Sequence, residues 1–320
     1  MASQRRDTTG EPAGAAAHDG PSSTAGAIVV GADGSETSKR AVRWAAERAA
    51  GRDLPLHVVY AYGLVARFFA AEAPMPPSVI NSLLEEAHAI AEAAANEARA
   101  VAPGVTVRTH VVDEAPVPAL TRRSRHAAQV VLGAAGQGGF TGMLAGSTAV
   151  AVAAHADAPV VVVRCAPDRQ APPARGPVVV GVDGSPLSER ALACAFDEAD
   201  LRGALLVAVH AWADVEDENL LRRAKLYFSG TPEEGQVRTL LDEQVAGWRE
   251  RYPDVAVESV AVRDRPRRQL LDRSTTAQLV VVGSRGRGGF TGLLLGSTSQ
   301  ALIHHASCPV MVVRPRGDET

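Results

Sequence analysis

Short apolar runs alternate with helical patterns along this chain. In the first half the runs cover 27–32, 54–60, 105–112, 129–132 and 159–163 and are continuous and rich in β-branched residues. Continuous runs of this kind suit strands that are buried on both faces. Stretches with helical periodicity follow at 36–50, 79–101, 116–127 and 147–156. This alternation predicts an α/β fold with a parallel sheet and helices on both faces.

The same pattern returns 150 residues later. The segment Ile28-Val-Val-Gly-Ala-Asp-Gly-Ser35 matches Val178-Val-Val-Gly-Val-Asp-Gly-Ser185, and the run 159–163 matches 309–313. A second set of strands is therefore expected near 177–182, 204–210, 255–262, 279–282 and 309–313. A repeat of this length predicts two tandem domains of one design.

The expected domains are 27–165 and 177–315, joined by a Pro-rich linker at 166–176. Residues 1–26 are rich in Ala, Gly, Ser and Thr and are expected to form a disordered tail, and 316–320 a second, short one. Right-handed crossovers leave a crevice at the carboxyl ends of parallel strands, where ligands bind.

Composition narrows the class of protein. The 320 residues are 46% hydrophobic, with 33 Lys and Arg against 36 Asp and Glu. The net charge therefore gives no overall attraction to nucleic acid or to an anionic membrane. Three cysteines without CxxC spacing favour neither disulfides nor a zinc site. The sequence shows no apolar stretch typical of a signal peptide or a membrane span, so a cytoplasmic protein is expected.

A glycine-rich loop follows the fourth strand of each half. It reads Gly133-Ala-Ala-Gly136 and Gly283-Ser-Arg-Gly286, and after nine intervening residues comes Gly146-Ser147-Thr148 or Gly296-Ser297-Thr298. We expect Gly286, Gly288 and Gly289 to adopt backbone angles closed to other residues and to let the main chain approach a ligand. The helix that begins after the loop offers free N–H groups and a positive dipole end to an anion.

This loop is neither of the two common nucleotide fingerprints. A GxxxxGK[ST] sequence is absent, and GxGxxG belongs after the first strand, where this chain carries Gly-x-Asp-Gly-Ser. Asp33 and Asp183 are expected at the strand ends beside the crevice, where a carboxylate can accept from a ribose hydroxyl or an adenine amino group. The alternative is that each Asp only stabilises a turn. Ser35 and Ser185 are expected to cap the following helix.

These motifs, in this order and present twice, resemble the universal stress protein family in its tandem two-domain form. The resemblance covers about 27–164 and 177–314. It implies a Rossmann-like, five-stranded parallel sheet in the order 3-2-1-4-5 in each domain. The family's ATP-binding subgroup carries the sequence Gly-x2-Gly-x9-Gly-Ser/Thr, and its members are mostly non-catalytic proteins linked to stress, low oxygen and dormancy.

The resemblance also implies nucleotide-binding residues. Asp33 and Asp183 match adenosine contacts, and other matches lie around adenine and ribose or at the third strand end. The first half supplies Ala61, Val112, Leu132, Gly133, Gly136, Gly146, Ser147 and Thr148. The second half supplies Ala211, Val262, Val282, Gly283, Arg285, Gly286, Gly296, Ser297 and Thr298. The implied ligand is ATP, with or without Mg²⁺, and no catalytic residue or dedicated metal site is assigned.

The two loops are not equivalent. The second keeps the common family form Gly-Ser-Arg-Gly-Arg-Gly-Gly, whereas the first reads Gly-Ala-Ala-Gly-Gln-Gly-Gly and lacks one hydroxyl and two guanidinium groups. Because Arg pairs bidentately with phosphate, we expect ATP to bind more tightly to the second half.

The runs 159–163 and 309–313 are expected at sheet edges, which invite pairing. In the family this edge forms the dimer contact, so we expect the two halves to pair through it within one chain as a pseudo-dimer. The sequence does not decide whether two whole chains form a homodimer, and it identifies neither the protein partner nor the stress signal.

Three functions remain. The leading one is an ATP-binding regulator or sensor in a stress or dormancy response. The second is an enzyme on the same scaffold, either a weak ATPase or an autophosphorylating protein, although no general base or metal-carboxylate cluster supports it. The third is an interaction scaffold without nucleotide, against which the intact loops argue.

Overall fold

The computed structural model describes residues 26–63, 76–136, 145–212, 234–286 and 294–315. The first half contains β1 (Ile28–Gly31), α1 (Glu36–Gly51), β2 (Leu56–Ala61), α3 (Pro77–Val101), β3 (Val107–Val112), α4 (Pro116–Ser124), β4 (Gln129–Gly133), α5 (Ser147–His155) and β5 (Val160–Val163). The second half contains β6 (Val178–Gly181), α6 (Pro186–Arg202), β7 (Leu206–Ala211), α8 (Glu234–Arg251), β8 (Val257–Val262), α9 (Pro266–Ser274), β9 (Leu279–Gly283), α10 (Ser297–His305) and β10 (Val310–Val313). The tails expected at both ends lie almost entirely outside the described residues.

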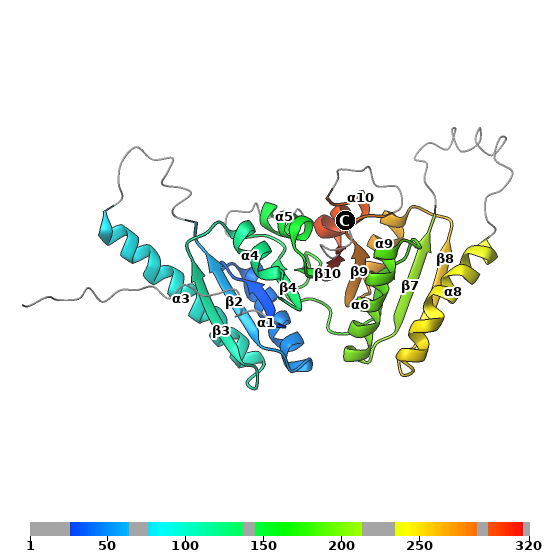
Figure 1. Cartoon of the computed structure of the whole chain (residues 1–320), viewed down its shortest axis with the longest axis horizontal. Helices are drawn as coiled ribbons and strands as arrows, with labels where there is room; N and C mark the ends of the chain where they lie inside the picture. The colour runs from blue at the N-terminus through cyan, green and yellow to red at the C-terminus, as the bar shows by residue number, and fades with distance from the viewer. Residues whose placement is uncertain (1–25, 64–75, 137–144, 213–233, 287–293, 316–320) are drawn as a thin grey trace, which may run out of the picture.

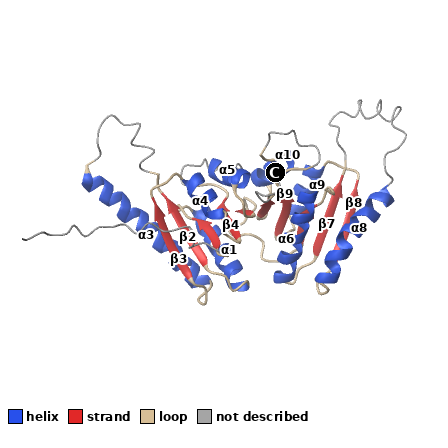
Figure 2. Ribbon diagram, viewed as in Figure 1, coloured by secondary structure: helices blue, strands red, loops and turns tan. Residues whose placement is uncertain are grey.

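One sheet runs through both halves. Its strand order is β3-β2-β1-β4-β5-β10-β9-β6-β7-β8, so each half has the order 3-2-1-4-5 and is parallel throughout. The edge strands β5 and β10 pair antiparallel, with Val161 opposite Met311. The α/β fold expected from the sequence is confirmed, and the expected edge strands are paired (Figures 1 and 2).

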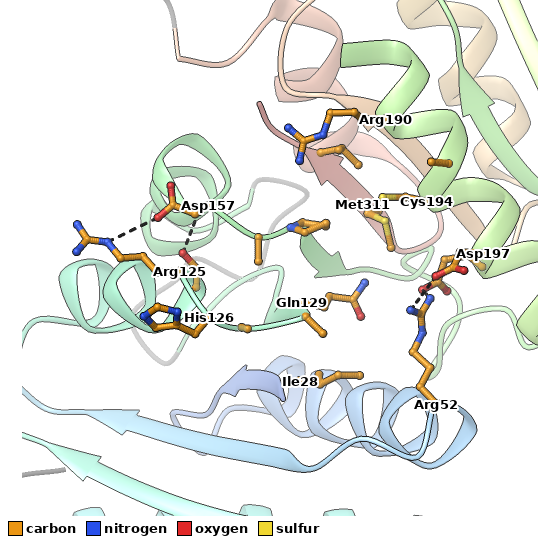
Figure 3. A pocket seen from close by; sticks show the side chains of 18 residues that line it. Ile28, Arg52, Arg125, His126, Gln129, Asp157, Arg190, Cys194, Asp197 and Met311 are labelled. Atoms are coloured by element: carbon orange, nitrogen blue, oxygen red, sulfur yellow. Dashed lines mark hydrogen bonds and ion pairs between the residues drawn. The ribbon is translucent and has the colours of Figure 1, made fainter. Parts of the chain in front are cut away.

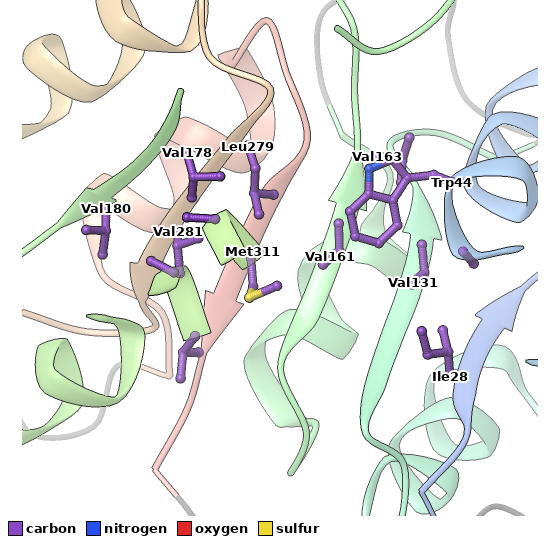
Figure 4. Close-up of a cluster of buried hydrophobic side chains, with 14 of the residues drawn as sticks. Ile28, Trp44, Val131, Val161, Val163, Val178, Val180, Leu279, Val281 and Met311 are labelled. Atoms are coloured by element: carbon purple, nitrogen blue, oxygen red, sulfur yellow. The ribbon is translucent and has the colours of Figure 1, made fainter. Parts of the chain in front are cut away.

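Both faces of the sheet are buried, which explains the continuous apolar runs. On β1, Ile28 and Val30 point into a core with α1 and α3, whereas Val29 points into a second core with α4 and α5. Figure 4 shows the first of these cores on both sides of the junction, with Val161 and Trp44 on one side and Met311 on the other. Each core therefore spans the two halves.

Small side chains let α3 lie close to the sheet. Ala87, Ala91, Ala95 and Ala98 are buried at helical spacing along its inner face. The repeat-related α8 buries larger side chains, including Leu241 and Val245. Although α3 has 25 residues, no helix in the described part of the chain combines the length and apolar character that a membrane crossing needs.

Candidate functional site

The chain leaves β1 and β6 through the same tight turn. Gly34 and Gly184 adopt left-handed backbone angles, with φ of 82° and 76°. Asp33 Oδ1 accepts the N–H of Ser35 at 3.0 Å, and Asp183 Oδ1 accepts that of Ser185 at 3.0 Å. Each Ser hydroxyl then caps its helix, as expected from the sequence. One carboxylate oxygen of each Asp thus has the turn-forming role that was the alternative to ligand contact.

The other carboxylate oxygen faces the glycine loop. A methyl group added at Gly136 would lie 2.6 Å from Asp33 Oδ2, and one at Gly286 would lie 2.9 Å from Asp183 Oδ2. The absence of a side chain at these glycines is what allows the carboxylate and the loop to approach each other. In both halves the structure thus brings together the two elements that the sequence placed beside one crevice.

The expected backbone angles were wrong for Gly286. Of the motif glycines in the described residues, none has φ in the left-handed region, whereas Gly34 and Gly184 do. Gly288 and Gly289 lie outside the described part of the chain. Steric room, rather than unusual dihedral angles, is therefore the reason for glycine at 136 and 286.

Each loop is closed by a hydrogen bond at its base. The N–H of Gly146 donates to the carbonyl of Ala134 at 2.7 Å, and that of Gly296 donates to Ser284 at 2.7 Å. The middle of each loop, 137–144 and 287–293, lies outside the described residues. The bond fixes the start of α5 and α10 directly beside the end of β4 and β9.

In the part of the chain that the structure describes, the first turns of α5 and α10 have no side-chain cap. Glycine is the N-cap residue in both, at Gly146 and Gly296, so no cap side chain engages the first N–H groups. The hydroxyls of Ser147 and Thr148, and of Ser297 and Thr298, lie in the same turns. Uncapped N–H groups, a positive dipole end and hydroxyl donors together form an arrangement that suits a phosphate.

Protein packing does not require glycine at these two N-caps. Among the described residues, the nearest atoms to a methyl group at Gly146 would lie 3.7 Å away, and at Gly296 3.6 Å away, which are ordinary contact distances. Their φ angles of −67° and −76° suit any residue. A methyl group at either position would pack against the backbone at the base of the loop without a clash among the described residues.

The remaining predicted residues lie at the same edge of the sheet. Ala61 pairs with Val112, and Ala211 pairs with Val262, at the carboxyl ends of neighbouring strands. Leu132 and Val282 lie one residue before the ends of β4 and β9, on the other side of β1 and β6. The structure therefore gathers the predicted set at one edge of each half, with the central strand between the Ala–Val pair and the loop.

Sequence reasoning missed three residues that hold the loops. In the first half Thr37 Oγ1 donates to the carbonyl of Ala135. In the second half Ser299 Oγ donates to the carbonyl of Ser284 at 3.0 Å. His304 Nδ1, on α10, accepts the N–H of Ala145 at 3.0 Å. A signal existed for all three, since none has the same residue at the repeat-related position.

A separate groove of about 810 Å³ lies between the halves, at the amino ends of β1 and β4 (Figure 3). Ile28 and Gln129 line it from the first half, and Arg190, Cys194 and Met311 from the second. None of the residues predicted to bind nucleotide contributes to its lining. The glycine loops, at the carboxyl ends, thus remain the candidate site.

The fold and these loops define a tandem Rossmann-like protein, and comparisons identify its family. The universal stress protein family model matches residues 25–164 and 175–314. The chain therefore belongs to the universal stress protein family.

Relatives match along almost their whole length. The universal stress protein Rv2005c of Mycobacterium tuberculosis is 44% identical over 292 residues, which is 90% of this chain and 96% of that protein. A relative from Mycolicibacterium smegmatis is 43% identical over 298 residues, covering 92% and 99%. A universal stress protein structure from Archaeoglobus fulgidus superposes with a TM-score of 0.64 at 20% identity, covering 92% of this chain and 98% of that one. At that identity the likeness concerns the fold.

Proposed function

We propose that this protein binds an adenine nucleotide, ATP in the first instance, in each half and regulates a stress or dormancy response. The observation that carries the proposal is the uncapped helix start at Gly146 and Gly296. In both halves it is fixed beside a glycine loop by a 2.7 Å hydrogen bond, and its N-cap glycine offers no side chain to the first N–H groups. This combination suits phosphate.

The phosphate and nucleoside ends of a bound nucleotide would contact different groups of the protein. The phosphates would lie at the loop and helix start, where N–H groups, hydroxyls and, in the second half, Arg285 are donors. The ribose would lie toward Asp33 or Asp183, and the adenine toward Leu132 and Ala61 or their counterparts. A magnesium ion, if bound, would be held mainly through the phosphates, since each half contributes one such carboxylate.

The proposed role is binding rather than turnover. Nucleotide would act by changing the conformation or the partner surface of the loops, as a ligand that binds one state more tightly shifts a population. Hydrolysis and autophosphorylation are the enzymatic alternatives, and a scaffold without nucleotide is the third.

The first experiment is to purify the intact protein, denature it by heat and identify any released nucleotide by chromatography and mass spectrometry. ATP at about two per chain is expected if both halves bind it tightly. Titration with ATP, ADP and a cyclic nucleotide, each with and without Mg²⁺, then ranks the ligands. Sustained ATP turnover that a variant with Gly286 and Gly296 replaced loses would favour the enzyme instead. If no nucleotide is released and titration with ATP produces no heat, the result would favour an interaction scaffold that binds no nucleotide.

A further inference from the structure

Helix α10 contacts both candidate sites. Its first turn, after Gly296, belongs to the site of the second half. Near its other end, His304 Nδ1 accepts the N–H of Ala145 at 3.0 Å. Ala145 directly precedes Gly146, the residue that starts the candidate phosphate site of the first half. One nine-residue helix therefore reaches from one loop to the other.

The first half holds this end of α10 in place. Arg164, directly after β5, donates from Nε to the carbonyl of Ala306 and from Nη1 to that of Ile303, both at 3.0 Å. Charge-assisted hydrogen bonds to the last carbonyls of a helix also complement its dipole. His304 is thus presented to the loop from an anchored helix rather than from a free end.

The chemistry of the His304 ring suits this contact. To accept a hydrogen bond, Nδ1 must be unprotonated, so the ring is neutral with its proton on Nε2. Burial lowers the pKa of His304, and the nearby His305 and Arg164 lower it further. The acceptor form is therefore the one favoured at neutral pH.

The contact has no repeat-related counterpart. Ala154 stands at the position of His304 and cannot accept a hydrogen bond through its side chain. Arg314 stands at the position of Arg164, and its Nε and Nη1 have no hydrogen-bond partner among the described residues. The second loop has instead an internal clamp, from Ser299 to the Ser284 carbonyl, whose positions in the first half are Ala149 and Ala134.

We propose that His304 is a positioning residue for the first half, so that the nucleotide site of that half is completed by the second. This inference rests on the proposed function. It predicts that nucleotide affinity of the first half depends on a side chain that touches no ligand and belongs to the other half.

The test uses the full chain with His304 replaced in two ways. His304→Leu removes the acceptor, whereas His304→Asn keeps an oxygen near the position of Nδ1. His305→Leu is the matched control on the same helix. Affinity for ATP at the first half is measured by calorimetry in a Gly286→Val background, and at the second half in a Gly136→Val background. Hydrogen exchange at the Ala145 amide is followed in parallel by NMR.

His304→Leu is expected to weaken ATP binding at the first half about tenfold, the effect of losing one partly buried hydrogen bond. Exchange of the Ala145 amide should quicken, and affinity at the second half should stay unchanged, which also shows that the variant folds. His304→Asn and His305→Leu should resemble the unaltered chain in every readout.

Two outcomes would overturn the inference. If both halves bind nucleotide and His304→Leu leaves the first affinity unchanged, the inference alone fails. If the unaltered chain binds no nucleotide, the proposed function fails and the inference fails with it.

Discussion

Glu198 is a buried carboxylate at the junction of the halves. Its side chain is fully buried, 2.8 Å from Arg52 Nη2 of the first half and in contact with Arg202 of its own helix. Arg48 and Arg202 also lie over the ring of Trp44, at 5.7 and 5.6 Å. Burial and the neighbouring guanidinium groups lower the pKa of Arg202 to about 8. The carboxylate of Glu198 is therefore the counter-charge to a crowded set of cations.

Removing this carboxylate should destabilise the protein strongly. We expect Glu198→Ala to lower the free energy of unfolding by about 3–5 kcal/mol, because it leaves the buried guanidinium group of Arg202 without its carboxylate partner. Asp197 is the matched control, since it also pairs with Arg52, at 3.0 Å, but its side chain is 49% exposed. Asp197→Ala should cost less than about 1 kcal/mol. Denaturant unfolding of both variants measures the difference, and equal losses would contradict this account.

Substitutions at the loop glycines should distinguish an effect on stability from an effect on nucleotide binding. Gly146→Ala meets only ordinary contacts, so it should change the free energy of unfolding by less than about 1 kcal/mol. It should nevertheless weaken ATP binding in the first half about tenfold or more, because the added methyl group would lie against the backbone of Ala135 and Gly136, beside the proposed phosphate site. Gly136→Ala is the comparison, since its methyl group would press on Asp33 and lower stability as well. Thermal unfolding and calorimetric titration report the two effects separately.

At the scale of elements, the two glycine loops are held differently and should bind differently. Arg285 is exposed on the second loop, where the first has Ala135. We expect Arg285→Ala to weaken ATP binding in the second half about tenfold, the effect of one charge-assisted hydrogen bond. The first half, measured in the same variant, is the control. Affinity that is equal in both halves of the unaltered chain would argue against a role for Arg285.

Helices α1 and α6 meet at Gly51 and Leu201, where a small residue faces a large one. A methyl group at Gly51 would lie 3.2 Å from Leu201 Cδ1, so the glycine accommodates the leucine. Gly51→Leu should cost about 1 kcal/mol, because the larger side chain presses on Leu201 at an exposed position. Combining it with Leu201→Ala should recover part of that loss, and a double-mutant cycle measures the coupling. Strictly additive losses would show that the two side chains do not interact.

The strands and helices were predictable because their signals are local. Each continuous β-branched run has one strand, and capping by Ser35 and Ser185 follows from their place before a helix. Contacts between distant residues were not predictable in this way. Ala145 and His304 are 159 positions apart, and Glu198 looks in the sequence like any charge on a helix surface. Its burial depends on how the second half meets the first.

At the scale of the whole molecule, the linker should not be what keeps the halves together. The paired β5 and β10, the two shared cores and the Arg52–Glu198 ion pair all join them. We expect a protease site placed at the exposed residues 168–171 to be cut without separating the halves, which should elute together from a sizing column. After cutting, thermal stability should depend on protein concentration, because unfolding would also release two chains. Separate elution at micromolar concentration would contradict this prediction.

Gly51 and Leu201 are the same position of the repeat, 150 residues apart, and they touch across the pseudo-twofold axis. In a dimer of identical chains, a residue on such an axis contacts its own copy, so every mutation there changes both sides of the contact at once. Joining the copies in one polypeptide ends that coupling, and one can become small while the other becomes large. Arg48 and Glu198 have diverged at a single repeat position in the same way, toward opposite charge. Each half has thereby become complementary to its neighbour and no longer to itself.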